Sequence, residues 1–121
     1  MIINQISNLL NKFKIDLPTL FKFAKVEITP KNLLEWFQHK NIYFLERIIK
    51  SAIELIDYKL LKSEYVQTRF ILKGLFQRTI IFQHGKITFY RWKYLIKPEY
   101  QNKNNPNYVY FLDTQNKIDK Y

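Results

Sequence analysis

Apolar residues in the first half of the chain recur at steps of three and four, the spacing that places them on one face of a helix. The first such series, from Ile2 to Phe13, predicts an N-terminal helix. Asp16-Leu17-Pro18 interrupts this series and predicts a short helix with Asp16 or Leu17 as its first residue. Thr29-Pro30 predicts another helix start, because a capping hydroxyl precedes a proline at the first helical position. This second segment predicts a helix that ends near His39.

The longest helix is predicted from Ile42 to Lys62. Its apolar face is expected to pack in the core and consists of Leu45, Ile48, Ile49, Ala52, Ile53, Ile56 and Leu60. On the other face, Glu46 and Lys50 are four residues apart, a spacing that favours an ion pair. Trp36, on the preceding helix, is also interpreted as a core residue.

In the second half the apolar period becomes two, which is typical of strands. Two runs rich in β-branched and aromatic residues, Gln77 to Gln83 and Lys86 to Ile96, are separated by His84-Gly85. A glycine between two such runs predicts an antiparallel hairpin. After a polar loop, Tyr108 to Leu112 predicts a third strand.

A two-residue loop at His84-Gly85 fixes the predicted register of the hairpin. The expected pairs are Phe82 with Ile87, Ile80 with Phe89, and Arg78 with Arg91. The first two pairs form an apolar face for the helices, whereas the third opposes two like charges. The reverse face is expected to carry Thr79, Ile81, Thr88, Tyr90, Trp92 and Tyr94.

These elements predict one α+β domain over residues 1–113, with helices in 1–63, a hairpin and third strand in 64–113, and a tail in 114–121. A chain of 121 residues with 47% hydrophobic residues is long and apolar enough for one core. It has no cysteine, which excludes disulfides and thiolate chemistry. We expect neither a secretory signal nor a membrane-spanning helix, and therefore a cytoplasmic protein with no membrane partner.

Charge is concentrated in residues 65–98, a window without any acid. Its basic residues are Arg69, Lys73, Arg78, Lys86, Arg91, Lys93 and Lys97, so the window carries seven of the formal +10 charges. Aromatic residues alternate with them, a combination that suits the phosphates and bases of nucleic acid. Lysine, tyrosine and phenylalanine are also favoured by A/T-rich codons, but the position of three of the four arginines in this window has no such explanation.

The same region contains an ordered set of short motifs. They are Gln67-Thr68-Arg69-Phe70, Lys73-Gly74, Arg78-Thr79-Ile80-Ile81, His84-Gly85 with the strand to Arg91, and Tyr108-Val109-Tyr110-Phe111-Leu112-Asp113. In this order they resemble the N-terminal region of ISLre-type transposase-like proteins, including versions on integrative elements of low-GC bacteria. The resemblance covers about residues 42–113, and His84 departs from it where an aromatic residue is expected.

The resemblance implies a mobile-element protein but not catalysis. Family members continue well beyond this length and are taken to cut and join DNA with carboxylates of a later domain. The acids after Asp57 are Glu64, Glu99, Asp113 and Asp119, and none has a recognisable metal-binding motif around it. We therefore expect a non-catalytic N-terminal segment or truncated remnant of a transposase, with no cofactor and no metal site.

Two functional interpretations remain open at this point. In the first, the hairpin binds DNA non-specifically, and the candidate contacts are Arg69, Lys73, Arg78, Lys86, Arg91, Trp92, Lys93 and Lys97. In the second, the aromatic face of the hairpin packs on a second copy or on the remainder of a longer transposase-like chain. Trp92 suits either role, as a stacking platform for a base or as a packing residue.

Overall fold

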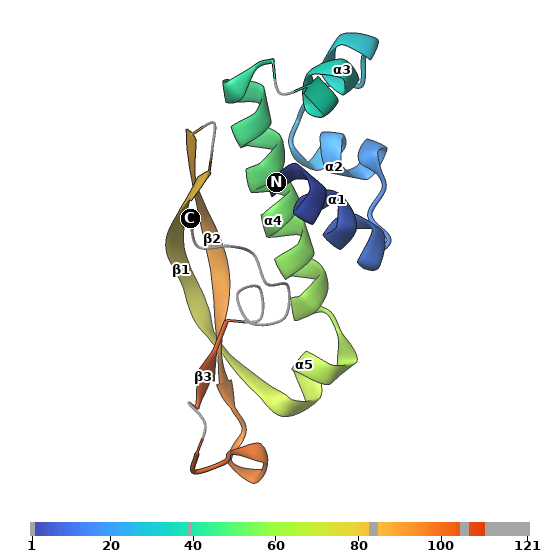
Figure 1. Cartoon of the computed structure of the whole chain (residues 1–121). Coiled ribbons are helices and arrows are strands. Elements are labelled where there is room, and N and C mark those ends of the chain that lie inside the picture. The colour runs from blue at the N-terminus through green and yellow to red at the C-terminus, as the bar shows by residue number, and fades with distance from the viewer. Residues whose placement is uncertain (1, 39, 83–84, 105–106, 111–121) are drawn as a thin grey trace.

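Helices precede an antiparallel sheet in the computed structural model of the chain, as the α+β prediction requires (Figure 1). The structure describes residues 2–38, 40–82, 85–104 and 107–110. Within them the elements are α1 (Ile2–Lys12), α2 (Leu17–Phe23), α3 (Pro30–Gln38), α4 (Ile42–Leu61), α5 (Glu64–Arg69), β1 (Phe70–Phe82), β2 (Gly85–Ile96), a 3-10 turn (Pro98–Tyr100) and β3 (Tyr108–Val109).

Side-chain caps fix where the helices start. Asp16, Thr29 and Asn41 each accept the backbone N–H three residues ahead, at 2.7, 3.1 and 3.1 Å, before α2, α3 and α4. Helix α2 therefore starts at Leu17, one of the two predicted first residues, and the predicted Thr29 cap before Pro30 is confirmed. Ser63 caps α5 in the same way at 3.4 Å, and this helix was not predicted because its six residues are too few to show a helical period.

Helix α4 lies between two layers, with α1, α2 and α3 on one side and the hairpin of β1 and β2 on the other (Figure 1). All seven residues of its predicted apolar face are buried. Because the helix is covered on both sides, a second set is buried as well: Phe44, Ser51, Leu55 and Asp57. Trp36 of α3 is only 1% exposed, which confirms it as a core residue.

The hairpin exists as predicted, but its predicted register is wrong by two residues. Phe82 pairs with Gly85 and Ile80 with Ile87, so the two residues between the strands are 83 and 84. Since the shift is even, each side chain keeps its predicted face of the ribbon. The expected Arg78–Arg91 opposition is absent, because Arg78 pairs with Phe89 and Arg91 with Phe76.

Gly85 lies where the start of β2 approaches α4. A Cβ built on Gly85 would lie 2.5 Å from Glu46 Oε1 and 3.7 Å from Ile42 Cγ2, and the glycine has a φ of 159°. A side chain here would have to displace the Glu46 carboxylate, and at this φ it would also strain the backbone. The sequence could not reveal this contact, which explains why the glycine was misread as a loop residue.

The hairpin twists as it passes α4, so opposite faces of β2 contact the helix in turn. Near the start of β2, Ile87 and Phe89 are buried, and near its end Tyr94 is buried and Trp92 packs against the core. The prediction that Tyr94 faces away from the core is therefore wrong. Two-stranded ribbons twist strongly, and the bulge at Lys73, between the paired residues Leu72 and Gly74, adds to this twist.

Where the strand turns past the helix, its backbone edge faces α4. The N–H of Tyr90 donates to Glu54 Oε2 at 3.2 Å, and the N–H of Trp92 donates to Asp57 Oδ2 at 2.7 Å. The same edge then pairs with β3 at Tyr94 and Leu95. The carboxylates of α4 thus continue a ladder that a longer third strand would otherwise complete.

Several predictions fall at or beyond the limits of the described residues. The predicted third strand is present at Tyr108–Val109, whereas residues 111 and 112 lie outside the described part, as do the predicted tail, His39 and His84. Strand β1 begins at Phe70, seven residues before its predicted start at Gln77.

Removing the carboxylate of Asp57 should destabilise the protein more than removing that of Glu54. Asp57 is 1% exposed, so Asp57→Ala leaves the Trp92 N–H buried without its acceptor, at a cost of about 1–3 kcal/mol. Glu54→Ala exposes its N–H partner to water and should cost about 0.5 kcal/mol. Urea unfolding measures both. Asp57→Asn retains an oxygen acceptor and should recover part of the loss; equal costs for the two alanine variants would contradict this account.

Gly85→Ala should lower the free energy of unfolding by about 1–3 kcal/mol, because it adds backbone strain and a collision with Glu46. The part of this cost that comes from the collision with Glu46 can be measured separately from the backbone strain. In a Glu46→Ala background the added Cβ no longer meets the carboxylate, so Gly85→Ala should lower the free energy of unfolding by less. A double-mutant cycle from urea unfolding gives the coupling, and additive costs would show that Glu46 does not restrict this position.

Candidate nucleic-acid interface

Three of the predicted basic residues share one face of the ribbon. Arg91 and Lys93 are two positions apart on β2 and therefore lie on the same face. Arg78 on β1 pairs with Phe89, which makes it the diagonal neighbour of Arg91. Diagonal neighbours in an antiparallel pair are about 7–8 Å apart. We call Arg78, Arg91 and Lys93 the cationic stripe; all three side chains are half-buried.

Aromatic rings hold two members of the cationic stripe. The guanidinium of Arg91 lies 3.9 Å from the ring centre of Tyr110. The ammonium of Lys93 lies 4.7 Å from the ring centre of Tyr108 and 5.2 Å from that of Phe76. Each such contact contributes about 0.5–1 kcal/mol when solvent-exposed. The rings thus fix the orientation of both cations on this face of the ribbon.

The other predicted contacts lie elsewhere. Arg69 ends α5, with its guanidinium 5.0 and 5.1 Å from the ring centres of Tyr65 and Tyr100. Lys73 is exposed at the bulge and Lys97 is half-buried after β2. Lys86 and Trp92 are on the ribbon face opposite the cationic stripe. The eight residues therefore do not form one surface.

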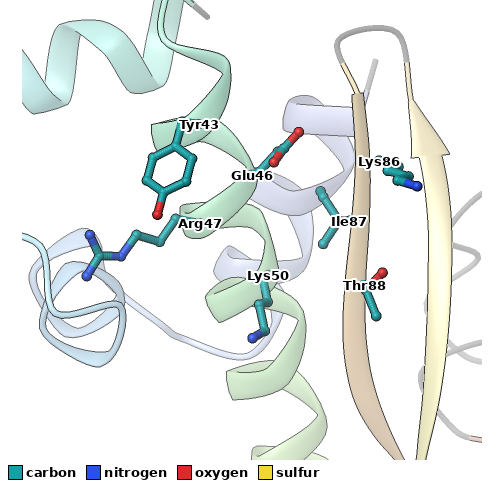
Figure 2. Close-up of a pocket in the computed structure, with 7 residues that line it drawn as sticks. All are labelled: Tyr43, Glu46, Arg47, Lys50, Lys86, Ile87 and Thr88. Atoms are coloured by element: carbon teal, nitrogen blue, oxygen red, sulfur yellow. The ribbon is translucent and has the colours of Figure 1, made fainter.

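Three further cations, Arg47, Lys50 and Lys86, are among the residues that line an open groove of about 430 Å³ between α4 and the start of β2. Figure 2 shows Tyr43, Arg47 and Lys50 on the α4 side and Lys86, Ile87 and Thr88 on the strand side. Arg47 also donates to the backbone carbonyl of Lys25 at 3.3 Å, which ties its head group to the segment after α2. We call this the tip groove.

Glu46 is the one acid that lines the tip groove. Its carboxylate lies against Gly85, and Figure 2 shows it directed away from Lys50. Within the described residues, the predicted Glu46–Lys50 ion pair is not formed. The contact with the hairpin holds the acid at one end of the groove, and Arg47, Lys50 and Lys86 leave the groove with a formal excess of two positive charges.

Burial and a nearby charge change the acidity of one tyrosine. Tyr94 is 1% exposed, and this burial raises the pKa of its phenol, with a further increase from the negative charge of Asp57. At the other end of the molecule, hydrogen bonds from Thr19 lower the pKa of Asp16, as its capping role requires. Neither group lies in the tip groove or in the cationic stripe.

Within the described part of the chain, no three His, Cys, Asp or Glu side chains come together as metal ligands do. None of the helices described there has both the length and the apolar composition needed to cross a membrane. Both histidines and Asp113 lie outside the described residues.

The sequence missed the tip groove, although it singled out Lys86. Arg47 and Lys50 are on a helix for which only packing in the core was predicted, and about 40 positions separate them from the strand. One signal pointed to it: Arg47 is the only arginine outside the acid-free window. Comparisons with protein-family models, with curated proteins and with solved structures gave no match.

The raised pKa of Tyr94 predicts a delayed ionisation in alkaline solution. The folded state holds this proton more tightly than the unfolded state, so the stabilisation is complete below pH 10 and is lost as the pH rises further. Tyrosinate absorbance should show a late step that is absent from Tyr94→Phe. In Asp57→Asn the step should move to lower pH, since one cause of the shift is removed. Identical titrations of the native chain and Tyr94→Phe would refute the assignment.

Proposed function

We propose that the chain is a non-catalytic DNA-binding module of a transposase-like protein, which holds duplex DNA weakly and with little sequence preference. The observation that carries the proposal is the composition of the ribbon. Strands β1 and β2 contain five basic residues and no acid: Lys73, Arg78, Lys86, Arg91 and Lys93. Basic side chains gain affinity for DNA chiefly by displacing counterions from its phosphates.

The shape of the ribbon supports the same function. The major groove of DNA admits a two-stranded antiparallel ribbon, and β1 and β2 form such a ribbon with their tip beside α4 (Figure 1). The separation expected between diagonal neighbours would let Arg78 and Arg91 meet different phosphates. Trp92 is omitted from the proposed contacts, because it packs against the core.

Sequence features add to the proposal. The ordered motifs from Gln67 to Asp113 favour a mobile-element protein, and the absence of cysteine fits a reducing cytoplasm, where we place the protein. We assign no catalytic residue and no cofactor, since the acids after Asp57 lack a metal-binding motif.

One observation favours an alternative role in assembly. Strand β1 is at an edge of the sheet, and no described strand pairs with its outer side. Ile71, Leu72 and Leu75 on this strand are 39%, 43% and 50% exposed. A long apolar edge can add a strand from a second copy or from another part of a longer chain. Such pairing would tolerate salt, whereas phosphate contacts would not.

Duplex DNA binding should weaken steeply with salt. If four or five cations reach phosphates, the slope of log K against log salt should be about −4. The double change Arg78→Gln and Arg91→Gln should lower affinity and flatten the slope by about two units. Fluorescence anisotropy with a labelled duplex at several salt concentrations gives both quantities.

The matched control removes the same charge from the helical layer, as Lys31→Gln with Lys59→Gln, both exposed lysines. It should leave the slope nearly unchanged. A salt-independent affinity, or equal effects of the two double variants, would refute binding through the ribbon. Concentration-dependent self-association in sedimentation, without DNA binding, would support the assembly role instead.

A further inference from the structure

Three aromatic rings gather around Arg91 and Lys93 on the sheet. The Lys93 ammonium lies 5.2, 4.7 and 5.8 Å from the ring centres of Phe76, Tyr108 and Tyr110. The Arg91 guanidinium lies 3.9 Å from the ring centre of Tyr110, which meets the Phe76 ring edge-on at 6.5 Å. We call Phe76, Tyr108 and Tyr110 the ring cluster. Its members come from β1, from β3 and from the residue after β3, so pairing of the strands brings them together.

Strand pairing also places the ring cluster on the side of the sheet away from the core. Residues directly opposite one another in an antiparallel pair share a face. Phe76 is opposite Arg91, and Tyr108 is opposite Leu95, which has the same face of β2 as Arg91. Val109, the next residue after Tyr108, packs against the core. Since successive side chains of a strand point to opposite faces, the rings point away from the core.

Two of these rings keep much of their surface in water. Phe76 is 44% exposed and Tyr108 is 49% exposed. Gly74 leaves space beside them, because it pairs with Lys93 without a side chain of its own, and a Cβ built there would lie 3.6 Å from Phe76 Cε2. No described residue covers the exposed parts of the two rings. Grouped apolar surface of this kind is typical of an interaction site.

The charge around the rings indicates which partner suits them. Strands β1, β2 and β3 contain five basic residues and no acid. Single-stranded nucleic acid matches both properties, because its bases stack on aromatic side chains and its phosphates pair with cations. In a duplex each base is stacked between its neighbours, so only unpaired bases present a face to a protein ring. A second copy of this chain would bring the same cations to the contact, and their repulsion opposes it.

We propose that the ring cluster, together with Arg91 and Lys93, binds unpaired bases of single-stranded DNA. This inference rests on the proposed function and adds a substrate class to it, since the module then prefers separated strands to the duplex. Phe76 and Tyr108 stack the bases, and the two cations contact the adjacent phosphates. Tyr110 positions Arg91, because its ring lies against the guanidinium.

The test removes exposed rings without changing charge. Phe76→Leu with Tyr108→Leu alters the ring cluster, and the matched control, Phe37→Leu with Tyr43→Leu, removes two exposed rings from the helical layer. In fluorescence anisotropy, the native chain should bind a labelled thymidine oligonucleotide about ten-fold more tightly than a duplex of the same length. The ring-cluster variant should lose about ten-fold in affinity for the oligonucleotide and less than about two-fold for the duplex. The control variant should match the native chain.

Two further measurements exclude a folding defect. The ring-cluster variant keeps every charge, so its slope of log K against log salt should equal that of the native chain. Phe76→Trp keeps a ring at this position and should bind the oligonucleotide at least as tightly as the native chain. Its emission should be quenched by the oligonucleotide beyond the native response, since a stacked base contacts the new indole. Emission that the oligonucleotide leaves unchanged would overturn the proposal.

The remaining outcomes separate this inference from the proposed function. If the native chain binds oligonucleotide and duplex equally, with steep salt dependence, the inference fails and the proposed function stands. If it binds neither, both fail. Tighter binding of a uridine oligoribonucleotide than of the thymidine oligonucleotide would overturn the assignment to DNA. Self-association that the two leucine changes abolish, without loss of oligonucleotide affinity, would make the rings a contact between copies and would also overturn it.

Discussion

The contact between the two layers depends on which groups accept hydrogen bonds from the outer backbone N–H groups of β2 where the strand passes α4. A strand edge presents N–H groups that must find acceptors when they are covered by protein. Here the acceptors are Asp57 and Glu54, which take the N–H groups of Trp92 and Tyr90. These bonds allow a twisted ribbon to contact a helix first through one face and then through the other. Without them, the two layers would meet only where a single face of the strand is apolar.

The helices could be predicted from sequence because their signals are local: a repeat of three and four, and caps such as Asp16 and Thr29. The strands could be located, but their register could not. Gly85 is consistent with a turn until its contact with Glu46 is known, and that contact joins residues 39 positions apart. Asp57 shows the same limit, since nothing in the sequence distinguishes a helix acid that accepts from a strand from one that faces water.

The sequence predicted which basic residues belong to the ribbon, but it did not predict how they are arranged on its two faces. Counting acids and arginines located the basic ribbon, and the structure then divided the predicted residues between opposite faces. Trp92 and Lys86 lie opposite the cationic stripe because alternation along β2 separates even from odd positions. The tip groove could not be predicted, since it exists only through the docking of β2 on α4, and helix periodicity had placed Lys50 on the face away from the core.

The two edges of the sheet also bear on the choice between DNA binding and assembly. The outer side of β2 is occupied by carboxylates and by β3, and of the two edge strands among the described residues β1 is much longer than β3. Yet β1 has a bulge at Lys73, and bulges and lysines on edge strands are features that discourage pairing with another chain. The same lysine adds positive charge to the ribbon. Two acids beside the ribbon, Glu54 and Asp57, each accept a backbone N–H of β2. The bulge and the lysine favour a ribbon that contacts phosphates over one that recruits another strand.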